Sequence, residues 1–484
     1  MSTLGQKAVR GGGIVLTGQL AKVLLQLGGL VVLGRILSPA DFGLIAMVTA
    51  IVGVADVLRD MGLSSAAIQA KTISHAQQSN LFWLNSAVGL LLTVTAIAVA
   101  WPIAALYGDD RLAVITMAVA PMFLLNGVQT QFQAHLARGL RFAQLSISEV
   151  LSMILGLAAA IGLALLGFGY WALVGQLIVQ AATLLIARAL MSGWRPGLPD
   201  RREPTRHLVR YGGNLMASQL LVYASSNVPS VIIGSRFGAS ALGFYGRASQ
   251  LVTFPMNQLF TPMTNVALPV LSRSHSEPEQ FERHLIRAQI VLSYAVVGLL
   301  GLAIVWAMPI IPLIFGQVWE PSAPLFQVLA VAGAFQAVSY VVYWVFLAKG
   351  LTGSHFRYSI MSRSILIAVV LLGSFFGAMG VAVGYVMGVA LGWPLSLFWL
   401  RRHRVAPIKR MFFTGLRVLT VGLVITGGGL IVSSVTRDYG AILQMATSGA
   451  AFVALACAVM FSLPVTRRDL GIVQGTVRHL LPGR

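Results

Sequence analysis

Long apolar runs separated by short polar links fill almost the whole chain. Crossing the hydrocarbon core of a bilayer takes about 20 mostly apolar residues. Runs of this kind lie at residues 12–33, 42–62, 80–104, 112–134, 144–167, 170–190, 209–234, 241–268, 287–311, 324–348, 358–377, 379–400, 412–434 and 441–463. The pattern predicts an all-α integral membrane protein with about fourteen membrane-spanning helices.

A sequence repeat divides this series of helices into two similar halves. The residues VRGGG at 9–13 return as VRYGG at 209–213, and the same offset matches Gly34 with Gly234 and Gly43 with Gly243. The connection at 191–208, rich in Pro, Gly and Arg, ends just before the repeat restarts. We therefore expect an N-lobe of six helices at 1–190, a cytoplasmic linker at 191–208 and a C-lobe of six helices at 209–400. Two further helices follow at 401–463, and a cytoplasmic tail at 464–484.

The even number of helices in each lobe predicts how the lobes are related. Both lobes enter the membrane in the same sense, so their pseudo-twofold axis is expected to run along the membrane normal. Transporters built from such repeats carry their substrate between the two halves. The repeat therefore predicts a central cavity between the lobes.

Charge gives the orientation in the membrane. Lysine and arginine number 34 against 14 aspartates and glutamates, a net charge of +20. With the N-terminus inside, most cations fall in the cytoplasmic links, the largest group running from Arg188 to Arg210, while the outer links hold only Arg35, Arg111, Arg236 and Arg437. This asymmetry follows the positive-inside rule and predicts that both termini are cytoplasmic. The cations form no basic face or domain, so no nucleic-acid partner is expected.

The chain lacks the motifs of the common enzyme and metal-site classes. It contains no Walker A sequence, HExxH, GxSxG or CxxC, and its links are too short to fold as an extramembrane domain. The pair Asp109-Asp110 lies in a short outer turn, where acids usually face water. We expect a protein that is not an enzyme and that uses no metal or cofactor. The single cysteine, Cys457, lies in an apolar run and is expected to be a buried thiol.

Ionisable residues inside predicted spans are costly and usually functional. Lys22 lies near the middle of the run at 12–33, and Gln19 and Gln26 share its helix face. This pattern favours a substrate-binding role for Lys22, Gln19 and Gln26. The alternative is a lysine satisfied in a helix contact.

Arg247 lies in the outer part of the run at 241–268, above a polar stripe that includes Asn257 and is interrupted by Pro255 and Pro262. Polar residues beside prolines suit a helix face that lines a wet cavity, so Arg247 and Asn257 are also candidate binding residues. The alternative for Arg247 is contact with outer headgroups.

Three other polar patterns stay open. Asp56 and Arg59 lie one turn apart in the inner half of the run at 42–62. Two interpretations are open: either they form an i, i+3 ion pair, or Asp56 balances Lys22 and releases it to substrate. Glu149, in the inner third of 144–167, pairs with a cation or exchanges a proton. Asn126, Gln129 and Gln133 form a stripe that either bonds to a neighbouring helix or lines a cavity for sugars.

The link segments carry a family resemblance. The segment GRILSPADFGL at 34–44 resembles the first outer-loop motif of bacterial polysaccharide-export flippases, and similar segments lie at 238–248 and 315–324. The chain is identified as similar to the Wzx branch of the multidrug/oligosaccharidyl-lipid/polysaccharide (MOP) exporter superfamily. The chain departs from the family at Ser226-Asn227, where an Asp-Asn pair is frequent.

The resemblance implies a V-shaped bundle of two six-helix lobes. It also implies that the protein moves an undecaprenyl-diphosphate-linked oligosaccharide from the cytoplasmic to the periplasmic leaflet, for exopolysaccharide, capsule or lipopolysaccharide. In the related lipid II flippase, cations on the first, second and eighth helices hold the diphosphate; Lys22, Arg59 and Arg247 occupy those helices here.

We therefore expect a flippase of the bacterial inner membrane that works by alternating access. Its site residues are Lys22, Arg247, Arg59, Asp56, Gln19, Gln26 and Asn257, and it acts as a monomer beside membrane lipids, a polysaccharide polymerase and the export machinery. One alternative is a drug antiporter of the same fold, for which buried carboxylates would be expected. A membrane polysaccharide polymerase is the other, and it would need a large outer loop.

Overall fold

The structure is a computed structural model. It describes residues 2–60, 73–200 and 206–480, with the side chains of 17–58, 73–200 and 219–476. The chain forms two compact units, Met1–Gly243 (unit 1) and Phe244–Arg484 (unit 2). Every regular element in the described ranges is a helix.

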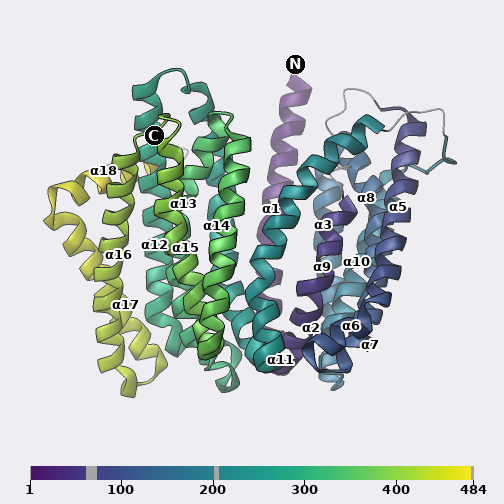
Figure 1. The fold of residues 1–484 in the computed structure, drawn as a ribbon, viewed down its shortest axis with the longest axis horizontal. Helices are drawn as coiled ribbons and strands as arrows, with labels where there is room; N and C mark the ends of the chain where they lie inside the picture. Colours follow the sequence, from purple (N-terminus) through teal and green to yellow (C-terminus); the bar gives the residue numbers. More distant parts are fainter. Residues whose placement is uncertain (1, 61–72, 201–205, 481–484) are drawn as a thin grey trace. The chain divides into compact units, whose positions relative to one another are not determined.

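Unit 1 contains the helices of the first half of the chain, and its longer ones run side by side in Figure 1. They are α1 (Ser2–Ile36), α2 (Pro39–Val52), α3 (Val54–Asp60), α5 (His75–Ala98), α6 (Ala100–Tyr107), α7 (Arg111–Val119), α8 (Pro121–Arg138), α9 (Phe142–Leu165), α10 (Trp171–Ser192) and the first part of α11 (Arg206–Arg273).

Unit 2 contains the remainder of α11 and the helices that follow it. These are α12 (Pro278–Phe315), α13 (Ser322–Ala348), α14 (Thr352–Gly373), α15 (Gly377–Arg401), α16 (Ile408–Val435), α17 (Ala441–Ser462) and α18 (Pro464–Leu480), with single 3-10 turns at Gln317–Trp319, Ser374–Phe376 and Arg437–Tyr439. The boundary between the units falls inside α11 and not in the connection at 191–208, so the lobe division expected from the repeat stays a prediction.

The predicted all-α membrane fold is confirmed. Eleven described segments are long and apolar enough to cross a membrane, and one of them, Thr352–Arg401, contains both α14 and α15. The two runs predicted at 209–234 and 241–268 lie in α11, which is interrupted by non-helical angles at Gly238 (φ 82°, ψ 179°). Glycines with positive φ also lie where the predicted runs 144–167 and 170–190 meet, at Gly167 (φ 82°), and where 358–377 and 379–400 meet, at Gly377 (φ 81°).

Three predicted spans are broken into two helices each. Gly53 separates α2 from α3, Val99 separates α5 from α6, and Ala120 separates α7 from α8. Pro121 begins α8 and has no N–H to continue the hydrogen-bond ladder of α7, which explains the last of these breaks. The first break lies against α11, where the Tyr223 hydroxyl donates to the Thr49 carbonyl over 2.6 Å.

The motif at 34–44 has a clear structural purpose. Ser38 caps α2 with its side chain accepting from the Asp41 N–H, and Asp41 accepts from the Ser38 N–H in return. One turn further on, a Cβ atom added to Gly43 would lie 1.8 Å from the Ala239 carbonyl oxygen, and one added to Gly243 would lie 1.9 Å from the Pro39 carbonyl oxygen. Because these pairs are related by the 200-residue offset, the repeat packs each copy of the motif against the other.

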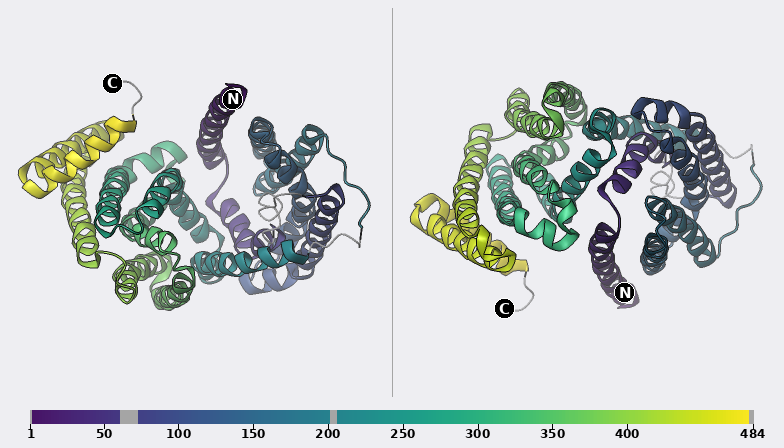
Figure 2. Two further views of the ribbon diagram at one scale, coloured as in Figure 1. Left: turned by 90° about the horizontal axis from the view of Figure 1, so that it is seen from above. Right: turned by 90° about the horizontal axis from the view of Figure 1, so that it is seen from below.

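The C-terminal region differs from what the sequence predicted. The residues expected to be only a tail form α18, which Figure 2 shows lengthwise while most neighbouring helices of unit 2 are seen nearly end-on. Cys457 is exposed on α17, so the expected buried thiol is wrong. Helix α17 packs on α12, α16 and α18, and Cys457 is not among its residues buried by these contacts.

We expect Gly243→Ala to destabilise the protein by roughly 1–3 kcal/mol, because the added methyl group would overlap the Pro39 carbonyl and force the two helices apart. The measurement is the melting midpoint of the purified protein in detergent. Gly246→Ala is the matched control on the same helix, since no atom lies within 4 Å of the Cβ position at Gly246. Equal melting midpoints for Gly243→Ala and wild type would contradict this account of the motif.

Candidate functional site

A close approach of two helices in unit 1 positions the candidate site. A Cβ atom added to Gly18 on α1 would lie 1.8 Å from Ser146 Oγ on α9, and one added to Gly29 would lie 2.8 Å from a methyl carbon of Leu157. The absence of side chains at these two glycines allows α1 to lie directly on α9. Lys22, between the two glycines, is thereby held next to α9.

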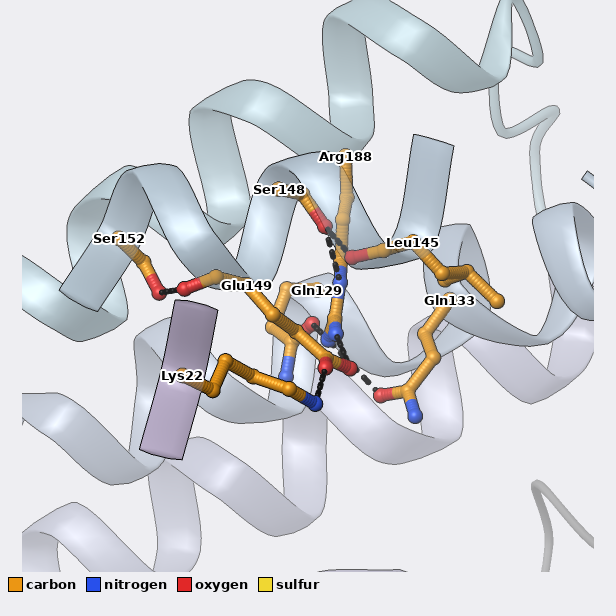
Figure 3. Close-up of polar contacts among 8 residues, drawn as sticks. All are labelled: Lys22, Gln129, Gln133, Leu145, Ser148, Glu149, Ser152 and Arg188. Carbon is orange, nitrogen blue, oxygen red and sulfur yellow. Dashed lines mark hydrogen bonds and ion pairs between the residues drawn. The ribbon is translucent and has the colours of Figure 1, made fainter. Parts of the chain in front are cut away.

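Lys22 is one of three residues that form an ion cluster (Figure 3). Its Nζ lies 2.7 Å from Oε2 of Glu149 on α9, while Nη2 of Arg188 on α10 lies 3.2 Å from the other carboxylate oxygen, Oε1. One carboxylate is therefore shared by two cations, one at each oxygen. The cluster carries a net charge of +1.

Arg188 is fixed in place by further hydrogen bonds. Its Nη1 donates to the amide oxygens of Gln129 and Gln133 on α8, and its Nε donates to Ser148 Oγ over 3.3 Å. The Arg188 side chain is only 4% exposed. A guanidinium buried in this way needs its donors satisfied, and residues from two neighbouring helices, α8 and α9, satisfy them.

The other two members of the cluster are accessible. The side chains of Lys22 and Glu149 are 28% and 34% exposed. An anion that approaches the cluster can therefore reach the Lys22 ammonium but not the Arg188 guanidinium. Lys22 is therefore the accessible cation of the cluster and Arg188 the fixed one.

The structure resolves several alternatives that the sequence left open. Lys22 pairs with Glu149 and not with Asp56, because the contact of α1 with α9 brings the α9 carboxylate to the lysine. Glu149 pairs with cations, and Gln129 and Gln133 bond to a neighbouring helix. Gln19 and Gln26 are exposed on α1, on either side of Lys22. Their substrate role stays a prediction.

Asp56 lines a separate cavity in unit 1. This cavity has a volume of about 470 Å³ and lies between α2, α3, α7, α8 and α11, with Thr49, Gln219 and Tyr223 among its polar residues. The Arg59 side chain, which the sequence places one turn from Asp56, lies outside the described residues.

Arg247 and Asn257 lie on α11 in unit 2. The Arg247 side chain is 5% exposed, donates from Nη1 to Gln250 Oε1 over 3.1 Å and stacks over the rings of Phe315 and Trp319 at 5.6 and 5.2 Å. In this conformation Arg247 does not contact outer headgroups, because the two aromatic rings cover its guanidinium. Asn257 is exposed. Binding of substrate by either residue stays a prediction.

Arg188 is the site residue that the sequence analysis missed. It was grouped with the cations that set membrane orientation, because it lies one turn from the cytoplasmic end of its predicted span. The available signal was Glu149, an intramembrane acid that needs a cation, together with the amide stripe at Gln129 and Gln133. Among the described residues, no group of three or more His, Cys, Asp or Glu side chains could hold a metal ion.

The family assignment rests on more than half of the chain. Residues 32–324 match a family described as "Polysaccharide biosynthesis protein". The chain belongs to this polysaccharide biosynthesis protein family. The match confirms the resemblance drawn from the link motifs, all three of which lie within or overlap the matched range.

Two relatives and one solved structure extend this assignment. The chain is 26% identical to the lipopolysaccharide biosynthesis protein WzxC of Escherichia coli (strain K12), over 80% of this chain and 79% of the relative. It is 25% identical to the succinoglycan biosynthesis transport protein ExoT of Rhizobium meliloti (strain 1021), over 62% and 61%. The family match and the eleven apolar segments confirm that the chain is a multi-pass membrane protein of a polysaccharide biosynthesis family.

The fold is shared with a flippase. A structure of the lipid II flippase MurJ in an inward closed conformation superposes with a TM-score of 0.73, at 14% identity, over 92% of this chain and 99% of that one. At this identity the similarity establishes the fold alone.

We expect Glu149→Gln to lower the free energy of unfolding by roughly 1–3 kcal/mol. The substitution removes the carboxylate partner of the buried Arg188 guanidinium, while the hydrogen bonds of Arg188 to other side chains remain. Lys22→Gln removes a partly exposed pair and should cost about 0–1 kcal/mol. Melting midpoints of the two purified variants test this order. A larger loss for Lys22→Gln would contradict the assignment of Arg188 as the fixed cation.

Proposed function

We propose that this protein flips an undecaprenyl-diphosphate-linked oligosaccharide from the cytoplasmic to the periplasmic leaflet of a bacterial inner membrane. The observation that carries the proposal is the accessible ammonium of Lys22, held by a carboxylate that is shared with a second cation. Membership of the polysaccharide biosynthesis family and the names of the relatives support the substrate class.

The ion cluster suits reversible capture of a diphosphate. When the anion arrives, Lys22 leaves Glu149 and pairs with a phosphate oxygen. Glu149 is then still bound to Arg188, so no charge is left unpaired in the membrane. When the substrate leaves, the carboxylate takes the lysine back. A lysine with no such counter-ion would hold the diphosphate more tightly and release it more slowly.

The exposed amides around Lys22 suit the sugars. Gln19 and Gln26 flank it on α1, and each offers both a hydrogen-bond donor and an acceptor to hydroxyl groups. Asp56 and Asn257 provide further polar groups, and Arg59 a further cation. Arg247 is covered by aromatic rings in this conformation, so it would contact substrate only after a rearrangement of unit 2.

Transport proceeds by alternating access of two lobes, residues 1–190 and 209–400, joined by the linker at 191–208. The prenyl tail stays in the surrounding lipid while the headgroup passes through the protein. An inside-negative potential favours outward movement of the diphosphate by about 2.3 kcal/mol per charge per 100 mV. The protein works as a monomer with both termini in the cytoplasm. It delivers the flipped oligosaccharide lipid to a polymerase and the export machinery.

The test is complementation of a strain that lacks this gene. Wild-type protein should restore surface polysaccharide, whereas Lys22→Ala should reduce it at least roughly tenfold, the factor expected for loss of one charge-assisted hydrogen bond to phosphate. The reduction should be accompanied by accumulation of lipid-linked repeat units in the inner leaflet. Lys22→Arg keeps the positive charge and should retain most of the activity.

Immunoblots of the membrane fraction control for protein level in each strain. Normal polysaccharide from the Lys22→Ala strain at wild-type protein level would rule out the proposed site. Drug resistance conferred by the wild-type gene, with no effect on polysaccharide, would support the antiporter alternative instead.

A further inference from the structure

A basic cavity lies in unit 2, apart from the ion cluster. It has a volume of about 740 Å³ and is formed by the N-terminal part of α12, the first turn of α16 and helix α18. Four arginines and two glutamates line it: Arg283, Arg287, Arg410, Arg468, Glu279 and Glu282. Its net charge is therefore +2.

Helix α18 forms one side of this cavity and is anchored to α12 and α16. Its buried Asp469 accepts hydrogen bonds from Arg417 on α16 over 2.9 Å and from the Tyr294 hydroxyl on α12 over 3.1 Å. These contacts fix α18 across the end of the unit (Figure 2). Arg468, the residue before Asp469, lines the cavity.

Hydrogen bonds and salt bridges with side chains engage two of the four arginines. Arg410 forms a salt bridge with Glu282 at 2.6 Å, and Arg287 donates to Thr476 over 3.2 Å. Within the described part of the chain, neither Arg283 nor Arg468 makes a hydrogen bond or salt bridge with a side chain. A guanidinium presents a planar fork of N–H donors that matches two oxygens of a phosphate group. The cavity thus offers two such forks from two different helices.

The position of the cavity points to a lipid as the source of the phosphate. Arg283 and Arg287 lie at or before the start of the apolar run of α12, and Arg410 lies just before that of α16. These positions correspond to the headgroup level on the side that charge asymmetry predicts to be cytoplasmic. The same helices carry exposed apolar side chains, Phe413 and Leu416 on α16 and Val465 on α18, where acyl chains would lie. Basic cavities between membrane helices at this level are typical sites for anionic lipid headgroups.

We propose that this cavity binds the phosphate of an anionic glycerophospholipid of the cytoplasmic leaflet, with Arg283 and Arg468 as its principal ligands. The site is independent of the flipped substrate and would attach α18, and through it α12 and α16, to the membrane surface.

The experiment measures lipid binding by the full-length protein purified in detergent, using native mass spectrometry with added phosphatidylglycerol. We expect Arg283→Gln/Arg468→Gln to weaken phosphatidylglycerol binding roughly tenfold or more, because it removes two charge-assisted contacts with phosphate. Arg401→Gln/Arg404→Gln is the matched control, since it removes two exposed arginines from the same end of unit 2 that do not line the cavity. Its affinity should equal that of wild type.

Phosphatidylcholine and inorganic phosphate complete the design. Phosphatidylcholine should bind at least tenfold more weakly than phosphatidylglycerol. Equal loss of affinity in both double variants, or equal binding of the two lipids, would overturn the proposal. Displacement of phosphatidylglycerol by millimolar inorganic phosphate, with the same dependence on the two arginines, would identify free phosphate as the ligand and overturn the lipid assignment. Should the double variant not be monodisperse, Arg283→Gln alone replaces it, with a smaller expected loss.

Discussion

A carboxylate inside a membrane protein is stable only when cations or donors surround it, and in unit 1 this requirement is met by sharing. Glu149 binds the buried Arg188 through one oxygen and the accessible Lys22 through the other. The arrangement separates two tasks that a simple ion pair would combine. Arg188 joins α8, α9 and α10, while Lys22 stays accessible at the other carboxylate oxygen.

Close helix packing makes this arrangement achievable. The glycines at 18 and 29 allow α1 to contact α9, and those at 43 and 243 allow the repeated motifs to contact one another. The motif contact is symmetric in the repeat, but the ion cluster is not, since Lys22 aligns with Val222 at the same offset. The duplicated glycines therefore build the scaffold common to both halves. The cation is an addition to one half and not a part of the repeated packing.

The long apolar runs were sufficient to predict an all-α, many-spanning membrane fold, because a bilayer leaves a chain few other solutions. The same reasoning identified Lys22 as an unusual intramembrane charge. It offered Asp56 as the partner of Lys22 and not Glu149, since pairing depends on which helices touch. Arg188 was assigned to the cytoplasmic cations because a charge near a span end gives the same sequence signal whether it faces water or the protein interior. Helix α18 was missed because a short amphipathic segment after the last span resembles a polar tail.

Transfer of Lys22 from Glu149 to the diphosphate of the substrate is the step on which the proposed function depends. The most direct test is flipping by the purified protein in proteoliposomes that contain a fluorescent undecaprenyl-diphosphate sugar in one leaflet. Wild type and Lys22→Arg should move the lipid to the opposite leaflet, whereas Lys22→Ala should do so at no more than about a tenth of the wild-type rate. Transfer by Lys22→Ala at the wild-type rate would contradict the account.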